Sequence, residues 1–236
     1  MKVLVLNGSP KGDRSDTMQI TRAFVEGMNS ACKNDVSVIN VIDRHIEYCT
    51  VCFACKHNGG RCVIDDDMKE ILTGFVASDV IIFNFPLHSY GMPAPLKKLV
   101  DRLMPLSSWR IECDGDGKYG HNTYRNLSQL RYVMICGCGY PNSKHNFEGA
   151  VKQFELKFPV NSTIITVPES PMFNIPQAAE FVRPRLVSLK AAGARYAESF
   201  EIGDSLHKEI CSVMIPEDIY AKFANGEIIL LSNKTL

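Results

Sequence analysis

The 236-residue sequence lacks a charge imbalance, because 26 Lys and Arg residues are matched by 26 Asp and Glu residues. The sequence therefore gives no indication of the basic surface of a nucleic-acid-binding protein or of a polybasic patch for membranes. No apolar run approaches the roughly 18 residues of a membrane span. The N-terminal MKVLVLNG has too few apolar residues for the core of a signal peptide. We expect no nucleic-acid partner, no membrane association and a cytoplasmic location.

Short apolar runs alternate with longer amphipathic segments. The runs are rich in β-branched residues and mostly apolar throughout, which is typical of strands covered on both faces. They lie at residues 2–8, 36–42, 80–86, 131–137 and 162–168. Helical patterns lie at residues 16–31, 65–77, 95–105, 146–157 and 184–200. This alternation predicts one doubly wound α/β domain with a five-stranded parallel sheet.

Two segments fall outside that pattern. Residues 107–128 are polar and turn-rich and contain the only tryptophan, and a loop of this length is usually functional or mobile. Residues 204–236 contain apolar patches around a short helical pattern. We assign the domain to residues 1–203 and expect the C-terminal extension, residues 204–236, to pack on the domain or on a partner subunit.

The first predicted strand ends in LNGSPKGDRSDTMQI, a turn of small, basic and hydroxyl residues before a helix. Asp16 and Gln19 have the spacing of a capping box. Hydroxyls and free amides at a helix N-terminus bind anions, above all phosphate. The turn lacks both the dinucleotide fingerprint G-x-G-x-x-G and the Walker sequence. The hydroxyls at 9, 15 and 17 suit a monophosphate held without magnesium, and an ordinary N-capped turn is the alternative.

A second loop, residues 86–91, follows the third predicted strand in FNFPLHSYGMPAPLKKLVDRL. It leaves the same carboxyl edge of the sheet as the first loop, where ligands of open α/β sheets bind. Pro86 and the Tyr90-Gly91 turn suit a flat ring. Together the two loops suit a ring tethered to a phosphate, and FMN is such a molecule.

Four of the nine cysteines lie close together, with the spacing C-x2-C-x2-C-x6-C: Cys49, Cys52, Cys55 and Cys62. In a reducing cytosol disulfides are disfavoured, so the cluster indicates metal binding or redox activity. Short spacings let successive thiolates face one centre, and Gly59-Gly60 frees the backbone to return the fourth. A [4Fe–4S] cluster, empty thiols and zinc stay open, although zinc sites usually pair two separated C-x2-C units.

The segments GSPKGDRSDT, DDDMKEI and PLHSYGMPAPLKKLVDRL, together with the four cysteines, resemble the NADPH-dependent FMN reductases and related multimeric flavodoxin-like proteins. Over about residues 1–200 the resemblance is closest to the iron–sulfur flavoprotein branch. It implies a flavodoxin-like sheet with the strand order 2-1-3-4-5. It also implies two FMN loops. The phosphate loop consists of Ser9, Lys11, Ser15, Asp16 and Thr17, and the ring loop of Pro86, Leu87, His88, Ser89, Tyr90 and Gly91.

Two residues depart from the family pattern. Asp16 stands where the family often has Asn, and a carboxylate beside a phosphate costs free energy unless it turns away to cap its helix. Lys11 and Arg14 offset that charge. His88 stands where the family often has Tyr, which puts an aromatic contact to the flavin in doubt.

Hydride transfer is chemistry that the flavin itself carries, so we assign no catalytic acid or base. We expect an FMN-dependent oxidoreductase that takes hydride from NAD(P)H and passes electrons to a small acceptor. The alternative is an iron–sulfur flavoprotein that relays electrons from a ferredoxin-like partner through a [4Fe–4S] cluster to FMN. The resemblance implies a homodimer or homotetramer with flavins near subunit interfaces. We expect residues 107–128, with Trp109, Tyr119 and Tyr124, or the extension to shield the flavin or to join that interface.

Overall fold

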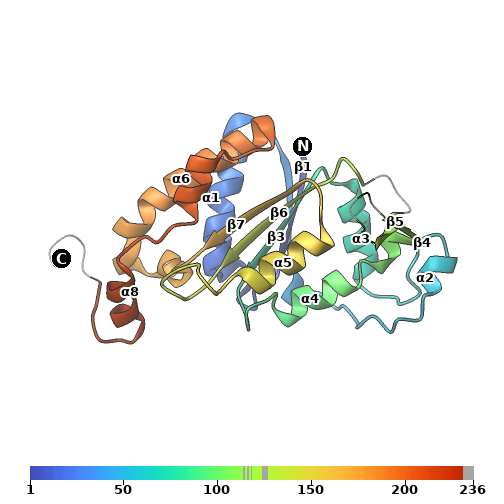
Figure 1. Ribbon diagram of the computed structural model, residues 1–236, viewed down its shortest axis with the longest axis horizontal. Helices are drawn as coiled ribbons and strands as arrows, with labels where there is room; N and C mark the ends of the chain where they lie inside the picture. Colours follow the sequence, from blue (N-terminus) through green and yellow to red (C-terminus); the bar gives the residue numbers. More distant parts are fainter. Residues whose placement is uncertain (114, 116, 118, 124–126, 231–236) are drawn as a thin grey trace.

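A five-stranded parallel sheet forms the centre of the protein (Figure 1). The computed structural model describes residues 1–113, 115, 117, 119–123 and 127–230. The sheet has the order β2-β1-β3-β6-β7. Its strands are β1 (Lys2–Asn7), β2 (Asp35–Asn40), β3 (Val80–Pro86), β6 (Arg131–Gly137) and β7 (Ser162–Val167), and each adjacent pair is parallel. Counted in chain order this is the predicted 2-1-3-4-5 arrangement, so the fold prediction is confirmed.

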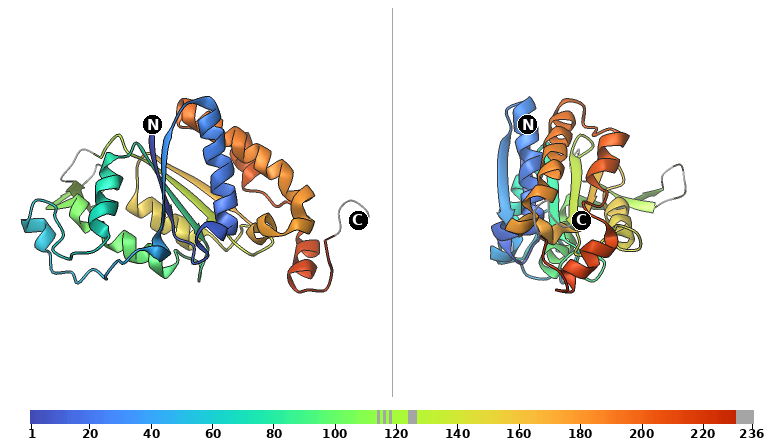
Figure 2. Two further views of the ribbon diagram at one scale, coloured as in Figure 1. Left: turned by 180° about the vertical axis from the view of Figure 1, so that it is seen from behind. Right: turned by 90° about the vertical axis from the view of Figure 1, so that its left-hand side faces the viewer.

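Helices cover both faces of the sheet (Figure 2). One face carries α1 (Asp16–Ala31) and α6 (Ala179–Ser199), and the other carries α3 (Met68–Ala77), α4 (Ala94–Asp101) and α5 (Glu148–Lys157). In β3, Val80 and Ile82 pack with α1 and α6, whereas Ile81, Phe83 and Phe85 pack with the other three helices. Burial on both faces explains why this strand is apolar throughout.

Helices α1 and α6 touch backbone to backbone. A Cβ on Gly27 would lie 1.9 Å from the carbonyl oxygen of Lys190, and one on Gly193 would lie 1.8 Å from that of Phe24. Only glycine permits this approach.

The remaining elements are short. They are α2 (Ala54–His57), α7 (Asp204–Ile210), α8 (Glu217–Ala224), and the 3-10 turns Gly12–Arg14, Val41–Asp43, Met104–Leu106, Ser170–Asn174 and Pro176–Ala178. The predicted helix 65–77 begins only at Met68, and Asp66, just before it, accepts from the Met68 amide and from Arg102. The predicted helix 95–105 ends at Asp101, and α6 begins at Ala179 and contains Pro184.

The segment 107–128, predicted as a loop, contains an antiparallel hairpin of β4 (Ser107–Cys113) and β5 (Tyr119–Thr123). Tyr124 lies outside the described residues. The hairpin projects at one end of the molecule, and α8 lies at the other (Figure 1). In the extension, Ile215, Tyr220 and Leu230 form an apolar cluster with Met172 and Val182 of the domain. Among the described residues, no helix is long and apolar enough to cross a membrane.

Candidate functional site

The loop between β1 and α1 buries the three predicted hydroxyls and brings two of them, on Ser15 and Thr17, into contact. Ser9, Ser15 and Thr17 are each about 1% exposed. Ser15 is the N-cap of α1: its Oγ accepts from the Met18 amide at 3.1 Å and lies 2.8 Å from the Thr17 Oγ1. The Ser9 Oγ accepts from the Lys11 amide at 3.2 Å. The side-chain oxygens of Ser15 and Thr17 thus lie at the start of α1, where the helix dipole favours an anion.

The predicted capping box of Asp16 and Gln19 is wrong, because Ser15 takes the N-cap position. Asp16 does not cap the helix. Its carboxylate accepts from the Asn174 side-chain amide at 2.6 Å and lies 3.4 Å from the Lys11 ammonium. Lys11 therefore offsets the charge of Asp16, as the sequence predicts, while Asn174 holds the carboxylate in place.

The ring loop contains a tight turn at its tip. His88 and Gly91 exchange two backbone hydrogen bonds, at 3.1 and 2.9 Å, and φ is positive at Ser89 and Tyr90. Two successive positive φ values define a type I′ turn. The side chains of His88, Ser89 and Tyr90 are exposed, whereas Pro86, Leu87 and Gly91 are half-buried. The turn presents its polar side chains outward at the carboxyl end of β3.

A third loop, residues 137–143 after β6, meets the other two and is absent from the sequence prediction. A Cβ on Gly137 would lie 2.8 Å from the Thr17 Cγ2, so this loop passes directly against the phosphate loop. Tyr140 stacks on Tyr90 with ring centroids 6.3 Å apart and an 8° interplanar angle. The signal was present in GCGY, which follows the fourth apolar run as Gly8 follows the first.

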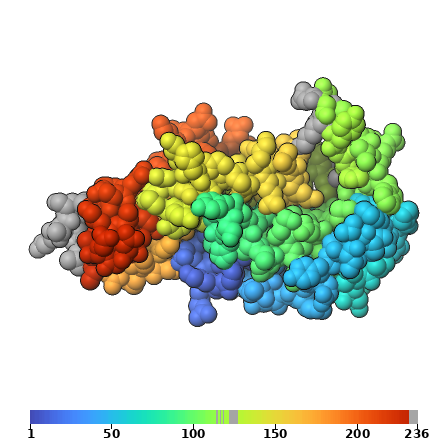
Figure 3. All heavy atoms as spheres, turned by 60° about the horizontal axis from the view of Figure 1, so that its bottom comes forward, coloured from blue at the N-terminus to red at the C-terminus, as the bar shows by residue number. Residues whose placement is uncertain are grey.

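Buried polar side chains hold the first two loops in register. The Asn84 amide donates to the Asn7 oxygen at 2.7 Å, and the Thr21 hydroxyl donates to the Asn84 oxygen at 3.0 Å. Gly8 leaves no room for a side chain, since its Cβ would lie 2.6 Å from the Leu96 Cβ. Figure 3 shows the three loops on one face, with the extension (red) at one side and the cysteine-rich segment (light blue) at the other.

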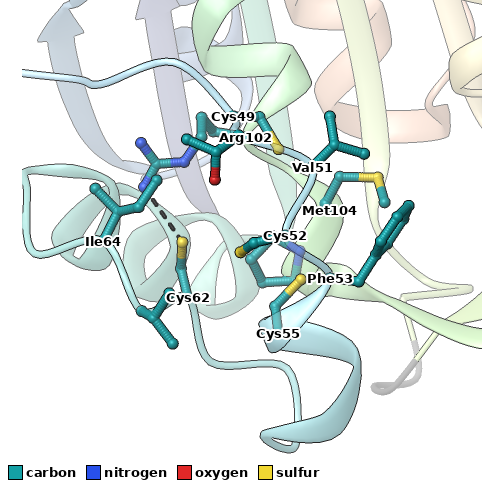
Figure 4. A pocket seen from close by; sticks show the side chains of 12 residues that line it. Cys49, Val51, Cys52, Phe53, Cys55, Cys62, Ile64, Arg102 and Met104 are labelled. Carbon is teal, nitrogen blue, oxygen red and sulfur yellow. Dashed lines mark hydrogen bonds between the residues drawn. The ribbon is translucent and has the colours of Figure 1, made fainter.

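The four cysteines predicted as ligands line one pocket (Figure 4). Cys55 is buried, Cys49 and Cys62 are half-buried and Cys52 is exposed, and none of the four forms a disulfide within the described chain. Burial raises the pKa of the Cys55 thiol, and the neighbouring thiols Cys62, Cys49 and Cys52 add to this effect. The four sulfurs are thus close enough to interact electrostatically.

Backbone strain accompanies this cysteine loop, which we define as residues 49–62. Val51 and Phe53 have φ values of 54° and 56°. A β-branched residue such as Val51 rarely adopts positive φ, and strain of this kind concentrates at functional sites.

The four cysteines form the donor set of a thiolate-bound cluster. In the described part of the chain, no three His, Cys, Asp or Glu side chains are grouped so that they could hold a metal ion. A four-iron cluster binds each thiolate to a different iron, so its ligands stand farther apart than those of a single ion. Four cysteines around one pocket therefore offer the four thiolates that a cluster needs.

A buried ion pair that the sequence did not predict closes the cysteine loop. The side chains of Arg102 and Asp66 are 1% and 0% exposed, and their closest atoms lie 2.6 Å apart. Arg102 also donates to the Cys62 sulfur at 3.4 Å. No short-range pattern could have revealed this pair, since 36 residues separate its members.

The hairpin packs on the cysteine loop. Trp109 of β4 contacts the rings of Phe53 and His57, with centroids 5.1 and 5.2 Å apart. The Lys56 ammonium donates to the Met104 carbonyl at 2.8 Å and to the Ser107 hydroxyl at 2.7 Å. These contacts fix the start of the hairpin against the cysteine loop.

Helix α4 lies between the cysteine loop and the ring loop. It begins at Ala94, just after the ring loop, and ends at Asp101, next to Arg102. Its eight residues span roughly 12 Å at about 1.5 Å per residue. One short helix therefore joins the two candidate cofactor regions.

Residues 1–157 match the family model described as flavodoxin-like fold. An iron–sulfur flavoprotein of Methanocaldococcus jannaschii is 33% identical over 108 residues, covering 45% of this chain and 53% of that protein. An FMN-dependent NADH:quinone oxidoreductase of Burkholderia lata is 23% identical over 177 residues, which cover 67% of this chain and 82% of that protein. The chain spans about half the length of the iron–sulfur flavoproteins that it matches.

Among solved structures, an FMN-dependent NADH-azoreductase from Bacillus anthracis, in complex with FMN, superimposes with a TM-score of 0.62 at 18% identity. The superposition covers 83% of this chain and 99% of the azoreductase. At this identity the likeness concerns the fold.

Proposed function

Because the chain belongs to the flavodoxin-like fold family, we propose that it is an FMN-dependent oxidoreductase that takes hydride from NAD(P)H and passes electrons to a small acceptor. The observation that carries this proposal is the pair of buried hydroxyls of Ser15 and Thr17 at the N-terminus of α1, with the Ser9 hydroxyl buried in the same loop. Such a group fits one phosphate, as FMN has, and the loop has no glycine-rich crossing for a pyrophosphate.

In this proposal, the three loops bind different parts of FMN. The phosphate loop would take the FMN phosphate, and the ring loop together with the third loop would border the flavin ring. Bound FMN would supply the hydride-accepting chemistry. The stacked pair Tyr90 and Tyr140 is 54% and 45% exposed, so it offers an apolar border open to a nicotinamide or an acceptor. We assign no acid or base to the protein.

The relatives support the nicotinamide donor and the small acceptor. The Burkholderia lata relative is named for NADH and quinone, and the Bacillus anthracis enzyme for NADH and azo compounds. Both names also include FMN. A planar conjugated acceptor of this class suits the exposed tyrosine pair. A homo-oligomer and a cytoplasmic location, which follow from the sequence analysis, belong to the same proposal.

Anaerobic stopped-flow measures the proposed reaction directly. Rapid bleaching of the flavin bands by NADH or NADPH is the expected result, and bleaching only by reduced ferredoxin would refute the reductase. Cofactor released by heat should run as FMN in chromatography. FAD in that fraction would overturn the single-phosphate site.

A matched pair of variants tests the phosphate loop. Thr17→Val removes a buried hydroxyl, and we expect roughly 10- to 100-fold weaker FMN binding, because a hydrogen bond to a charged group contributes about 1.5–3 kcal/mol. Thr73→Val is the control, since its exposed hydroxyl bonds to the Lys69 carbonyl within α3. Equal FMN affinities of the two variants would place the phosphate elsewhere.

The cysteine loop favours a second function, that of an electron relay. We propose that Cys49, Cys52, Cys55 and Cys62 hold a [4Fe–4S] cluster, supported by their shared pocket and by the iron–sulfur flavoprotein relatives. A bound cluster would supply one-electron transfer, with a ferredoxin-like protein as the donor. Iron analysis of anaerobically reconstituted protein should give about four iron atoms per chain. Cys52→Ser should abolish this iron content, whereas Cys32→Ser, outside the loop, should preserve it.

A further inference from the structure

We propose that Arg102 is a positioning residue that tunes the reduction potential of the cluster through its hydrogen bond to the Cys62 sulfur. This inference rests on the proposed cluster in the cysteine loop. Figure 4 shows Arg102 above Cys62, with the bond between them drawn as a dashed line.

The guanidinium of Arg102 is held by three other bonds. One terminal nitrogen donates to Asp66 Oδ2 at 2.6 Å and to the Glu47 carbonyl at 2.7 Å. The other donates to Asp66 Oδ1 at 3.0 Å and to the Cys62 sulfur at 3.4 Å. Because the planar fork is fixed by a bidentate carboxylate, the remaining N–H of its two terminal nitrogens is aimed at Cys62.

Asp66 is itself fixed. Its carboxylate accepts from the amides of Glu47 and Met68 at 2.9 and 3.1 Å. The pair thus joins the two ends of the cysteine-rich segment to the C-terminal end of α4. Burying two charges costs desolvation free energy that a surface pair does not pay, so stability alone explains the pair poorly.

Burial gives these charges a strong effect on Cys62. Water screens an exposed cation, whereas a buried one acts through a medium of low dielectric constant. A hydrogen bond from a cation to a ligating sulfur favours the more negative, reduced state of a cluster and so raises its potential. The carboxylate of Asp66 opposes that effect. The two side chains should therefore shift the potential in opposite directions.

The test is a redox titration of the reconstituted cluster, followed by its electron paramagnetic resonance signal. The step is a one-electron reduction in which dithionite supplies the electron and no bond forms or breaks. Arg102→Gln should lower the ratio of reduced to oxidised cluster at a fixed potential about tenfold, which corresponds to about 59 mV for a one-electron couple. Asp66→Asn should move this ratio in the opposite direction, because it leaves the charge of Arg102 uncompensated.

Two further variants separate tuning from folding. Arg102→Lys keeps the charge but not the fork, so its potential should lie between those of wild type and Arg102→Gln. Arg44→Gln removes the cation of a more exposed pair with Glu70 and should leave the potential unchanged. If Arg102→Gln does not fold, the upward shift in Asp66→Asn decides the question.

The outcomes distinguish this inference from its premise. A wild-type protein that takes up no iron overturns both the cluster and the role of Arg102. Iron uptake with potentials that stay constant, or that move in the same direction in Arg102→Gln and Asp66→Asn, overturns only the role of Arg102. Opposite shifts of the reduction potential support the role of Arg102. A pair that served only to stabilise the fold would lower the stability of both variants without shifting their potentials in opposite directions.

Discussion

Replacing Glu169 by Gln should make the protein more stable at alkaline pH. Glu169 follows β7 and its side chain is fully buried. One carboxylate oxygen accepts from the amide of Met214 in the extension, while Oε1 has no hydrogen-bond partner among the described residues. Burial raises the pKa of Glu169 from 4.5 to about 7, and the hydrogen bonds from the Met214 and Ile215 amides, with the nearby Arg185, only partly oppose this.

The sign follows from proton binding. Between pH 4.5 and 7 the folded protein retains a proton on Glu169 that the unfolded chain has lost, so the free energy of unfolding falls as pH rises. A pKa that rises from 4.5 to about 7 corresponds to roughly 3 kcal/mol. This stability is present below pH 4.5 and is lost above about pH 7. Gln has no proton to lose, so the variant lacks this dependence.

Urea unfolding at pH 5 and pH 8 measures the effect. The difference in free energy of unfolding between Glu169→Gln and wild type should grow by up to about 3 kcal/mol from pH 5 to pH 8, in favour of the variant. Glu198→Gln, an exposed substitution on α6, is the control for the loss of a surface charge. A difference between variant and wild type that does not change with pH would refute the buried, protonated carboxyl.

Three further predictions concern the contact of α1 with α6, the third loop and the cysteine loop. Gly193→Ala forces a Cβ to within 1.8 Å of a carbonyl oxygen of α1 and should cost at least about 1–3 kcal/mol in chemical denaturation, whereas Gly74→Ala, with its nearest neighbour at 3.8 Å, should not. Tyr220→Phe removes a 3.2 Å bond to the Gly139 carbonyl in the third loop and should weaken FMN binding several-fold in a fluorescence titration, since a neutral hydrogen bond contributes about 1 kcal/mol. Trp109→Ala should speed proteolytic cleavage within the cysteine loop, and an unchanged rate would show that the hairpin does not restrain it.

The sheet could be predicted because its signal is local. Each strand between two helical layers must be apolar on both faces, so β3 stands out without knowledge of its neighbours. The phosphate loop could be predicted for a related reason, since its hydroxyls lie within nine residues of one strand–helix turn. Helix boundaries were less accurate where a tertiary contact overrides local preference. Asp66 illustrates this, because it lies before α3 and its carboxylate accepts both from Arg102 and from the Met68 amide at the start of that helix.

The features that could not be predicted from the sequence are contacts between segments that are distant along the chain. The cysteine loop and the hairpin arise from separate connections, one after β2 and one after α4, and meet through Lys56 and Trp109. Arg102 then fixes the cysteine loop to α4, the helix that begins beside the ring loop. These additions lie outside the central sheet, so they can change while the sheet and its phosphate loop persist. Because Arg102 at the end of α4 bonds to Cys62 and α4 begins just after the ring loop, this helix connects Cys62 structurally to the ring loop.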